Sequence, residues 1–151
     1  MNLIKSYFEL TKPKVVMMML ITAIVGMLLA SKTLPPLSLI VISLLGIGLC
    51  ASSAATINQI IDRNIDANMA RTSERPLPQG NITTLNASIF ALILMIAGTT
   101  ILVLKVNTLT ALLTVSSLIG YAFIYTVFLK RATPQNIVIG GLAGAAPPLL
   151  G

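Results

Sequence analysis

The sequence predicts an all-α fold, a multi-pass transmembrane helical bundle with four complete helices and a truncated fifth. Two observations predict it. Only 9% of the 151 residues are charged, whereas soluble domains carry about 25%. The mean hydropathy is +0.94, and the apolar residues form long continuous runs. Because lipid leaves no backbone hydrogen bond for water to satisfy, such runs must be helices. Their continuous apolarity excludes the alternating strands of a membrane barrel.

Five apolar runs define the predicted helices, each judged against the 20 or so residues that cross a bilayer: residues 15–30, 37–61, 85–104, 108–129 and, incomplete, 137–150. Pro13 suits the first turn of the first helix, where its missing N–H is not needed. Pro35 and Pro36 separate the first run from the second. Thr83 or Thr84 is the predicted cap of the third helix.

The composition also excludes several classes of function. The net charge is +6, but the basic residues lie between apolar runs and form no basic face, so nucleic acid is not an expected partner. With no His and a single Cys, the sequence has no Ser-His-Asp triad, no zinc-finger site and no internal disulfide. The lipid bilayer is the expected surrounding.

The basic residues predict the orientation in the membrane. One side receives eight of the ten: Lys5, Lys12, Lys14, Arg63, Arg71, Arg75, Lys130 and Arg131. The other side receives Lys32 and Lys105. Because cytoplasmic loops are enriched in Lys and Arg, the N-terminus and both long polar loops are predicted to be cytoplasmic.

A polar stripe follows the second apolar run. Asn58, Asp62 and Asp66 are spaced four apart, so on a helix they share one face. Two carboxylates at this spacing repel each other, and a divalent cation removes that repulsion. The donors are hard oxygens without thiolate or imidazole, which suits Mg²⁺ and not Zn²⁺ or copper. We therefore predict a Mg²⁺ site formed by these three residues.

Cationic residues near the stripe predict a phosphate ligand. Mg²⁺ is usually held by one or two carboxylates together with substrate phosphates. Arg71 and Arg75 follow the stripe, and Lys130 and Arg131 end the fourth helix on the same side. Arg binds phosphate through two donors and Lys acts as a point charge. The pattern predicts a diphosphate site at the cytoplasmic surface, beside a cavity for a long apolar tail.

A plainer interpretation of the aspartates remains open at this point. Asp62 and Asp66 could form a solvated face that pairs with Arg63 and Arg71, because surface charge pairs are common and weakly informative. Arg63 lies off the stripe in an ideal helix and is interpreted as a membrane-orienting residue.

Several other features are predicted to serve packing. Met17, Met18 and Met19 face different directions on a helix, so lipid-facing or core positions are favoured over a Cu(I) site. Cys50 is predicted to be a small core residue. The small residues in the second and fifth runs favour close helix packing: Gly46, Gly48, Ala51, Ser52, Ser53, Ala54, Gly140 and Gly144. An aromatic belt or a cavity wall explains the aromatic cluster: Tyr121, Phe123, Tyr125 and Phe128.

The stripe and its flanks resemble the UbiA-type intramembrane prenyltransferases. The pattern of Asn58, Asp62 and Asp66, followed by RTSERPLPQG, is similar to the first aspartate-rich motif of that family. Residues 7–30 and 125–151 are similar to the first helix and the fourth-to-fifth helix junction of its haem-farnesylating branch, the protohaem IX farnesyltransferases or haem O synthases. The resemblance implies a Mg²⁺-dependent prenyltransferase of the bacterial inner membrane, which transfers farnesyl from farnesyl diphosphate to haem B and forms haem O.

The resemblance also implies roles for single residues. Asn58, Asp62 and Asp66 would hold Mg²⁺ and the diphosphate. The leaving diphosphate would be neutralised by four cations: Arg71, Arg75, Lys130 and Arg131. Tyr125 would face the developing allylic cation. The implied catalytic residues are Asp62, Asp66, Lys130 and Tyr125. Terminal-oxidase assembly proteins are the implied protein partners.

This sequence departs from the family in one respect. The family is longer and has a second aspartate-rich motif, which residues 1–151 lack. We therefore expect the chain to be the N-terminal part of a single transmembrane prenyltransferase domain, inactive unless a partner chain supplies the rest. Two other hypotheses remain: a prenyltransferase for an aromatic or quinone precursor such as 4-hydroxybenzoate, and a non-catalytic membrane fragment or assembly subunit.

Overall fold

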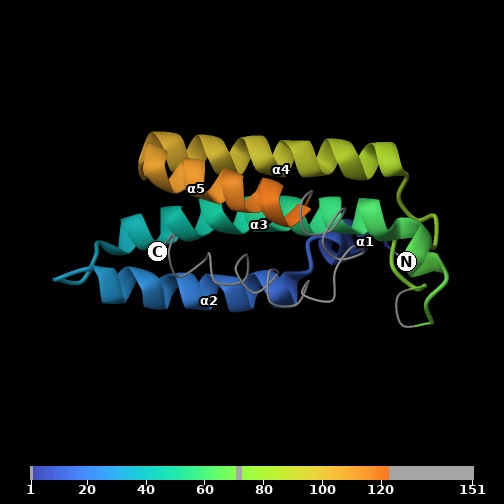
Figure 1. The fold of residues 1–151 in the computed structure, drawn as a ribbon, viewed down its shortest axis with the longest axis horizontal. Coiled ribbons are helices and arrows are strands. Elements are labelled where there is room, and N and C mark those ends of the chain that lie inside the picture. Colours follow the sequence, from blue (N-terminus) through green and yellow to red (C-terminus); the bar gives the residue numbers. More distant parts are fainter. Residues whose placement is uncertain (1, 71–72, 123–151) are drawn as a thin grey trace.

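The computed structural model describes residues 2–70 and 73–122, and within these ranges every regular element is helical. Five α-helices follow one another along the chain: α1 (Leu3–Leu10), α2 (Pro13–Ala30), α3 (Leu37–Ala67), α4 (Thr84–Lys105) and α5 (Thr108–Ile119). Figure 1 shows α2 to α5 as a bundle in which each helix runs antiparallel to the one before it. The all-α prediction is confirmed.

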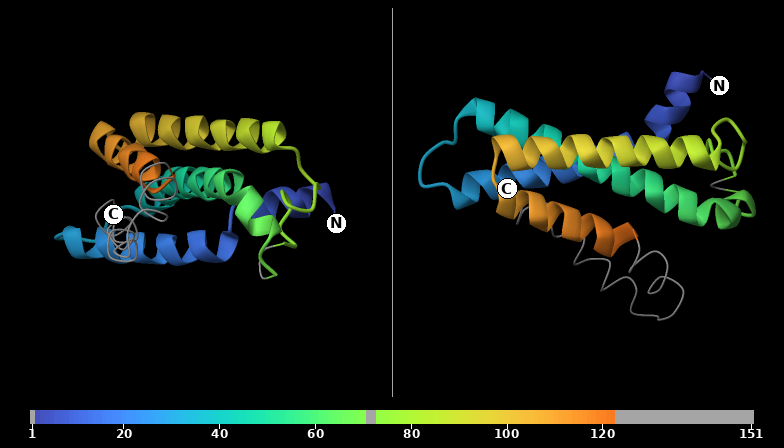
Figure 2. Two further views of the ribbon diagram at one scale, coloured as in Figure 1. Left: turned by 45° about the vertical axis from the view of Figure 1, so that its right-hand side comes forward. Right: turned by 90° about the horizontal axis from the view of Figure 1, so that it is seen from above.

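Different segments of the chain lie at the two ends of the bundle. The turns after α2 and α4 lie at one end, whereas α1 and the loop before α4 lie at the other (Figure 1). Figure 2 shows α1 leaving the bundle at a steep angle. Consequently the end that carries the N-terminus also carries the polar segment that the sequence analysis singled out.

Three of these helices are long and apolar enough to cross a membrane: Pro13–Ala30, Leu37–Asn64 and Thr84–Lys105. Their outer surfaces carry large apolar side chains, of which Met18 is 64%, Leu29 82% and Ile93 59% exposed. Lipid tails solvate such side chains whereas water does not. Together with the helix lengths, this exposure identifies an integral membrane protein.

The helix ends follow local signals in the sequence. Pro13 lies in the first turn of α2, as predicted. Thr83 caps α4 by accepting a hydrogen bond from the Asn86 backbone N–H at 3.2 Å, which satisfies one of the free donors of a first helical turn. Asn107 caps α5 in the same way, through the N–H of Thr110 at 2.6 Å.

Two features of the helices differ from the sequence prediction. The short helix α1 was not predicted, although Asn2 caps it by accepting from the Ile4 N–H at 3.2 Å. The second apolar helix was predicted to end at residue 61, but α3 continues to Ala67. The end of the apolar run indicates where the helix leaves the hydrocarbon layer, whereas the helix itself continues through the polar stripe. The incomplete helix predicted at 137–150 lies outside the described residues.

Small residues bring α3 and α4 into close contact, as the sequence predicted. A Cβ atom added at Gly98 would lie 2.8 Å from the Gly46 carbonyl oxygen and 2.7 Å from Cys50 Sγ. Between the same helices, Ser53 Oγ donates to the Ala91 carbonyl at 2.7 Å. Backbone atoms can approach this closely only where side chains are absent.

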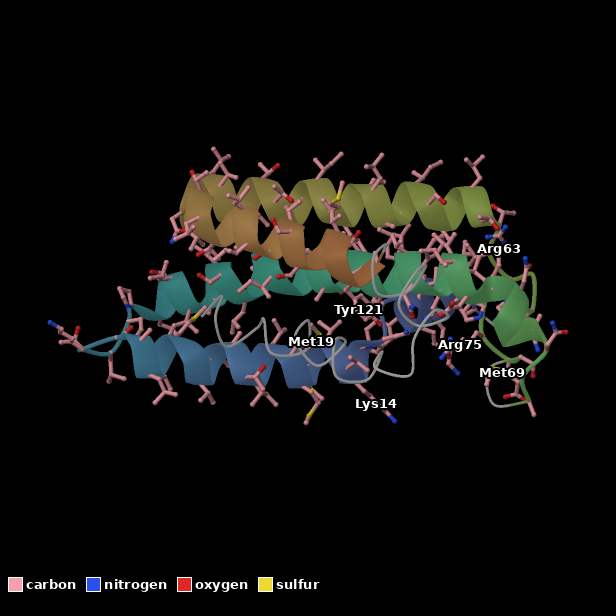
Figure 3. The ribbon with its side chains drawn as sticks, viewed as in Figure 1. Lys14, Met19, Arg63, Met69, Arg75 and Tyr121 are labelled. Atoms are coloured by element: carbon pink, nitrogen blue, oxygen red, sulfur yellow. The ribbon has the colours of Figure 1, made fainter. Side chains whose placement is uncertain are left out.

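The residues interpreted as packing residues lie where packing requires them. Cys50 is 1% exposed and belongs to the apolar core between α3, α4 and α5. Met17 and Met18 are exposed on α2, and Met19 is half-buried (Figure 3). Tyr121 is half-buried and packs against the core. The other aromatic and small residues of these predictions lie outside the described residues: Phe123, Tyr125, Phe128, Gly140 and Gly144.

Candidate functional site

The length of α3 places its polar end near the edge of the hydrocarbon layer if Leu37 lies at the opposite edge. Asn58 is about 32 Å along the helix from Leu37 at 1.5 Å per residue, and the hydrocarbon core is about 30 Å thick. The remaining residues up to Ala67 therefore reach the headgroup region. Polar side chains on this last part of α3 meet both the membrane surface and the buried ends of the neighbouring helices.

Three polar residues within about one turn of α3 are buried. Asn58 is 5%, Gln59 2% and Asp62 3% exposed. Asn58 Nδ2 donates to Asp62 Oδ2 at 3.2 Å, so the amide and the carboxylate do share one helix face. For Asp62 the solvated-face interpretation is wrong. Arg63 is exposed and donates to the carbonyl of Ile60 in its own helix at 2.8 Å.

Lys12 is a member of this polar cluster that the sequence analysis missed. Its Nζ donates to Asn58 Oδ1 at 2.6 Å. The ammonium, the amide and the carboxylate of Asp62 thus form a continuous chain of hydrogen bonds from α2 to α3. In the sequence Lys12 is 46 positions from Asn58, and a lysine before a membrane helix is ordinarily a membrane-orienting residue.

Gln59 and Thr56 hold α1 against this end of α3. Gln59 Nε2 donates to the carbonyls of Glu9 at 3.2 Å and Leu10 at 3.3 Å. Thr56 Oγ1 lies 3.4 Å from the same Leu10 carbonyl. The last carbonyls of a helix have no partner within it. The Glu9 carbonyl also accepts from the Lys12 backbone N–H at 3.2 Å, and the Gln59 amide ties both carbonyls, and with them the corner that carries Lys12, to α3.

The loop before α4 packs against the same end of the bundle. Pro76 and Leu77 are buried, and Leu77 packs in an apolar cluster with Leu10 of α1 and Ala87 of α4. A chain of turns follows, in which Asn81 N donates to the Pro76 carbonyl at 3.0 Å. Gly80 has φ +74°, a conformation that glycine adopts readily. The loop is therefore folded onto the bundle.

Arg75, a predicted diphosphate ligand, lies in this folded loop and is half-buried. Figure 3 shows Arg75 and Arg63 at the polar end of the bundle, where they appear on opposite sides of α3. Arg75 directly precedes the buried Pro76, so its backbone is held at this end of the bundle.

Several predicted site residues lie outside the described part of the chain: Arg71, Tyr125, Lys130 and Arg131. The backbone of Asp66 belongs to α3, but its side chain also lies outside the described residues. Of the predicted metal ligands, the structure therefore brings together Asn58 and Asp62.

The donor atoms of this cluster suit a hard cation. The described residues contain no group of three or more His, Cys, Asp or Glu side chains. What they offer is an amide oxygen and one buried carboxylate one turn apart on α3. Mg²⁺ is commonly held by one or two carboxylates and completes its shell with water and substrate phosphates. The oxygens present therefore fit Mg²⁺, which Asn58 and Asp62 would hold.

The fold and this cluster together define a class: an intramembrane helical protein with a buried cluster of polar side chains at one surface of the bilayer. The profile of the UbiA prenyltransferase family matches residues 19–151. The chain belongs to the UbiA prenyltransferase family.

Individual members of the family are similar to this chain over nearly all of its length. The chain is 61% identical over 147 residues to protoheme IX farnesyltransferase 2 of Pseudoalteromonas atlantica, which covers 97% of this chain and 48% of that protein. It is 60% identical to protoheme IX farnesyltransferase of Teredinibacter turnerae, over 97% of this chain and 47% of the relative. The chain thus spans about half the length of the curated relatives it matches.

A solved structure is similar in fold. It comes from work on the biosynthesis of digeranylgeranylglyceryl phosphate synthase in membranes, and it matches with a TM-score of 0.88 at 25% sequence identity. The match covers 99% of this chain and 52% of that one. The helical arrangement described above is therefore shared with another membrane protein.

Proposed function

We propose that this chain contributes the N-terminal part of the active site of a Mg²⁺-dependent protohaem IX farnesyltransferase. In this proposal farnesyl passes from farnesyl diphosphate to haem B, giving haem O. The observation that carries the proposal is the Asn58–Asp62 pair, a buried amide and carboxylate at the polar end of a membrane-spanning helix. The name of the 61% identical relative supports the acceptor and the prenyl donor.

The residues of the cluster have separate tasks in this reaction. Asn58 and Asp62 would hold Mg²⁺, which supplies charge neutralisation to the diphosphate oxygens when bound. Arg75 adds a cation from the folded loop, suited to two parallel hydrogen bonds with a phosphate. Fixed charges of this kind are already in position, so they stabilise the charge that develops on a leaving group without having to rearrange.

The apolar surroundings of the cluster exclude water. Leu10, Leu77, Ile82 and Ala87 form a buried apolar group at this end of the bundle, and Ile60 of α3 packs against it. Exclusion of water strengthens electrostatic interactions within a site and protects reactive intermediates from hydrolysis. An allylic cation requires such protection.

The decisive experiment uses the chain completed with the C-terminal half of the Pseudoalteromonas atlantica relative, hereafter the completed protein. We expect it to form haem O from haem B and farnesyl diphosphate. Asp62→Asn, and likewise Asp66→Asn, should abolish this activity because each removes a carboxylate from the metal site. The matched control is Arg63→Gln, which removes an exposed charge beside Asp62 and should leave the activity unchanged.

The acceptor is tested with the same protein. Offered haem B and 4-hydroxybenzoate separately, it should prenylate haem B alone. Transfer to 4-hydroxybenzoate would favour the aromatic-acceptor hypothesis, and no transfer to either would favour a non-catalytic membrane protein. Full activity in both aspartate variants would contradict the site. Co-purification with terminal-oxidase assembly proteins tests the implied partners.

The orientation in the membrane is also part of the proposal. The helix that carries Arg63 ends where the N-terminus lies, and Lys32 and Lys105 lie in the turns at the opposite end (Figure 1). By the positive-inside rule the N-terminal end faces the cytoplasm of the bacterial inner membrane. In spheroplasts, a membrane-impermeant maleimide should label Lys32→Cys but not Arg63→Cys, and labelling of the second alone would reverse the orientation.

A further inference from the structure

Lys12 has an unusual backbone conformation at the corner between α1 and α2. Its φ is 50° and its ψ is 61°, in the left-handed region. Among the described residues it is the only non-glycine residue with a positive φ. Pro13 follows, and a proline disfavours helical conformations in the residue before it. Such conformations persist only where the surrounding structure enforces them, and they concentrate at functional sites.

The contacts around Lys12 explain how this conformation is enforced. On its N-terminal side, Gln59 donates to the carbonyls of Glu9 and Leu10. At its own side chain, Nζ donates to Asn58 Oδ1 at 2.6 Å. The corner is therefore bound to one turn of α3 both through its backbone and through the ammonium.

The ammonium occupies the oxygen that a metal would use. Asn58 has one amide oxygen, which accepts from Lys12, and its Nδ2 donates to Asp62 Oδ2. This pair of bonds fixes which way the amide faces. A divalent cation on the same oxygen would lie within a few ångströms of the ammonium, and like charges at that separation repel strongly in a buried site.

From this geometry we propose that Lys12 is the resident counter-cation of the Asn58–Asp62 pair, and that its ammonium moves to the diphosphate when a divalent cation binds. In the metal-free site it neutralises Asp62 through the amide and keeps Asn58 oriented. When a divalent cation binds the amide oxygen, electrostatic repulsion displaces the Lys12 ammonium. The ammonium then donates its hydrogen bonds to the oxygens of the diphosphate. The inference rests on the proposed function, because it needs a metal and a diphosphate at this site.

The experiment measures metal binding rather than activity. Mn²⁺ replaces Mg²⁺, and its binding to the completed protein in lipid nanodiscs is followed by electron paramagnetic resonance. Lys12→Gly keeps the left-handed backbone without a side chain, and Lys12→Met keeps the length of the side chain without the charge. Both should bind Mn²⁺ alone more tightly than the wild type, by about five- to ten-fold, since a competitor is removed.

The second measurement is of diphosphate affinity, which should change in the opposite direction to Mn²⁺ affinity. With Mn²⁺ saturating, both variants should bind inorganic diphosphate more weakly than the wild type, by about five- to ten-fold, and Lys12→Arg should restore that affinity. Lys14→Met is the matched control, because it removes an exposed ammonium two residues away. It should match the wild type in both titrations.

The outcomes separate this inference from the proposed function. Asp62→Asn should lose Mn²⁺ binding; if it does not, the metal site and the proposed function both fail. If it does, but the two Lys12 variants bind Mn²⁺ as the wild type does or more weakly, Lys12 is only a brace of the α1–α2 corner and this inference is overturned. Unchanged diphosphate affinity in the Lys12 variants overturns it equally.

Discussion

The middle of α3 and its polar end contact their neighbours in opposite ways. In the middle, a Cβ atom added at Gly98 of α4 would lie 2.8 Å from the Gly46 carbonyl oxygen, and one added at Gly46 would lie 2.6 Å from Leu102 Cδ2. At the polar end, Asn58 and Gln59 use long side chains to reach Lys12 and the carbonyls of α1. Along the first region α3 approaches its neighbour closely because glycines have no side chain. Along the second it contacts its neighbours through side-chain hydrogen bonds. Substitutions in the two regions should therefore affect different properties.

The largest effect is expected at the polar end, on activity. Asn58→Leu in the completed protein removes a proposed metal ligand and the amide that orients Asp62. Loss of a group that orients a metal ligand lowers metal affinity or activity by about 10- to 100-fold, so haem O formation should fall by about 100-fold, the upper end of that range. Steady-state assays at saturating farnesyl diphosphate measure it.

Asn64→Leu provides the control for that substitution. Asn64 lies on the same helix, but it is exposed, so the same change should leave activity unaffected. Equal losses in the two variants would show that α3 tolerates no leucine here, and the loss at Asn58 would then carry no information on metal binding.

The next effect is expected in the middle of α3, on stability. At Gly98 an added Cβ would lie 2.8 Å from the Gly46 carbonyl oxygen and 3.0 Å from the Cys50 backbone nitrogen. Backbone atoms cannot rotate away, so Gly98→Ala should force the helices apart and destabilise the protein by about 1–3 kcal/mol. Thermal unfolding in detergent measures it.

Gly48→Ala is the matched control. The nearest atom to its added Cβ is Leu20 Cδ1 at 3.4 Å, at the far end of a flexible side chain. We expect an unfolding temperature close to that of the wild type. A Gly98→Ala protein as stable as Gly48→Ala would contradict the description of the α3–α4 contact.

A smaller effect is expected where α1 meets α3. Gln59→Leu removes the side-chain amide that bonds the carbonyls of Glu9 and Leu10, of which Glu9 keeps the backbone N–H of Lys12 at 3.2 Å. It also removes Oε1, a buried oxygen with no hydrogen-bond partner among the described residues. The net loss should be about 1–2 kcal/mol. It should be local, and faster hydrogen exchange within residues 3–10 than in α4 would reveal it. Uniformly faster exchange would argue against a local role.

The sequence predicted the middle of α3 better than its polar end. Apolar runs, prolines and caps are local signals, so the membrane helices, the cap at Thr83 and the glycine packing followed from short stretches. The clustering of Asn58 with Asp62 also followed, because a spacing of four is itself a helix property. Each of these depends on residues within one turn or one helix.

The partners of the polar end could not be predicted in this way. Lys12 reaches Asn58 only because the chain turns between α1 and α2, through the short helix α1, the left-handed conformation of Lys12 and Pro13. The helix and the left-handed conformation depend on contacts with α3 itself. The loop before α4 likewise folds onto the bundle through Leu77, which packs with Leu10 of α1 and Ala87 of α4. Local sequence carries no signal for contacts formed between elements that are about 50 residues apart.

The smallest effect should come from a polar contact placed among the glycines. Ser53 Oγ donates to the Ala91 carbonyl of α4 at 2.7 Å, so Ser53→Ala removes an interhelical hydrogen bond from the packed middle of α3. Such bonds contribute only about 0.6 kcal/mol on average within membranes, because a free backbone carbonyl finds other partners. Ser88→Ala removes a bond of similar length, 2.8 Å, to the Thr84 carbonyl of its own helix, and should change stability less. If Ser53→Ala instead destabilised the protein as much as Gly98→Ala, hydrogen bonding and not close backbone approach would hold α3 to α4, and the contrast between the two regions of α3 would disappear.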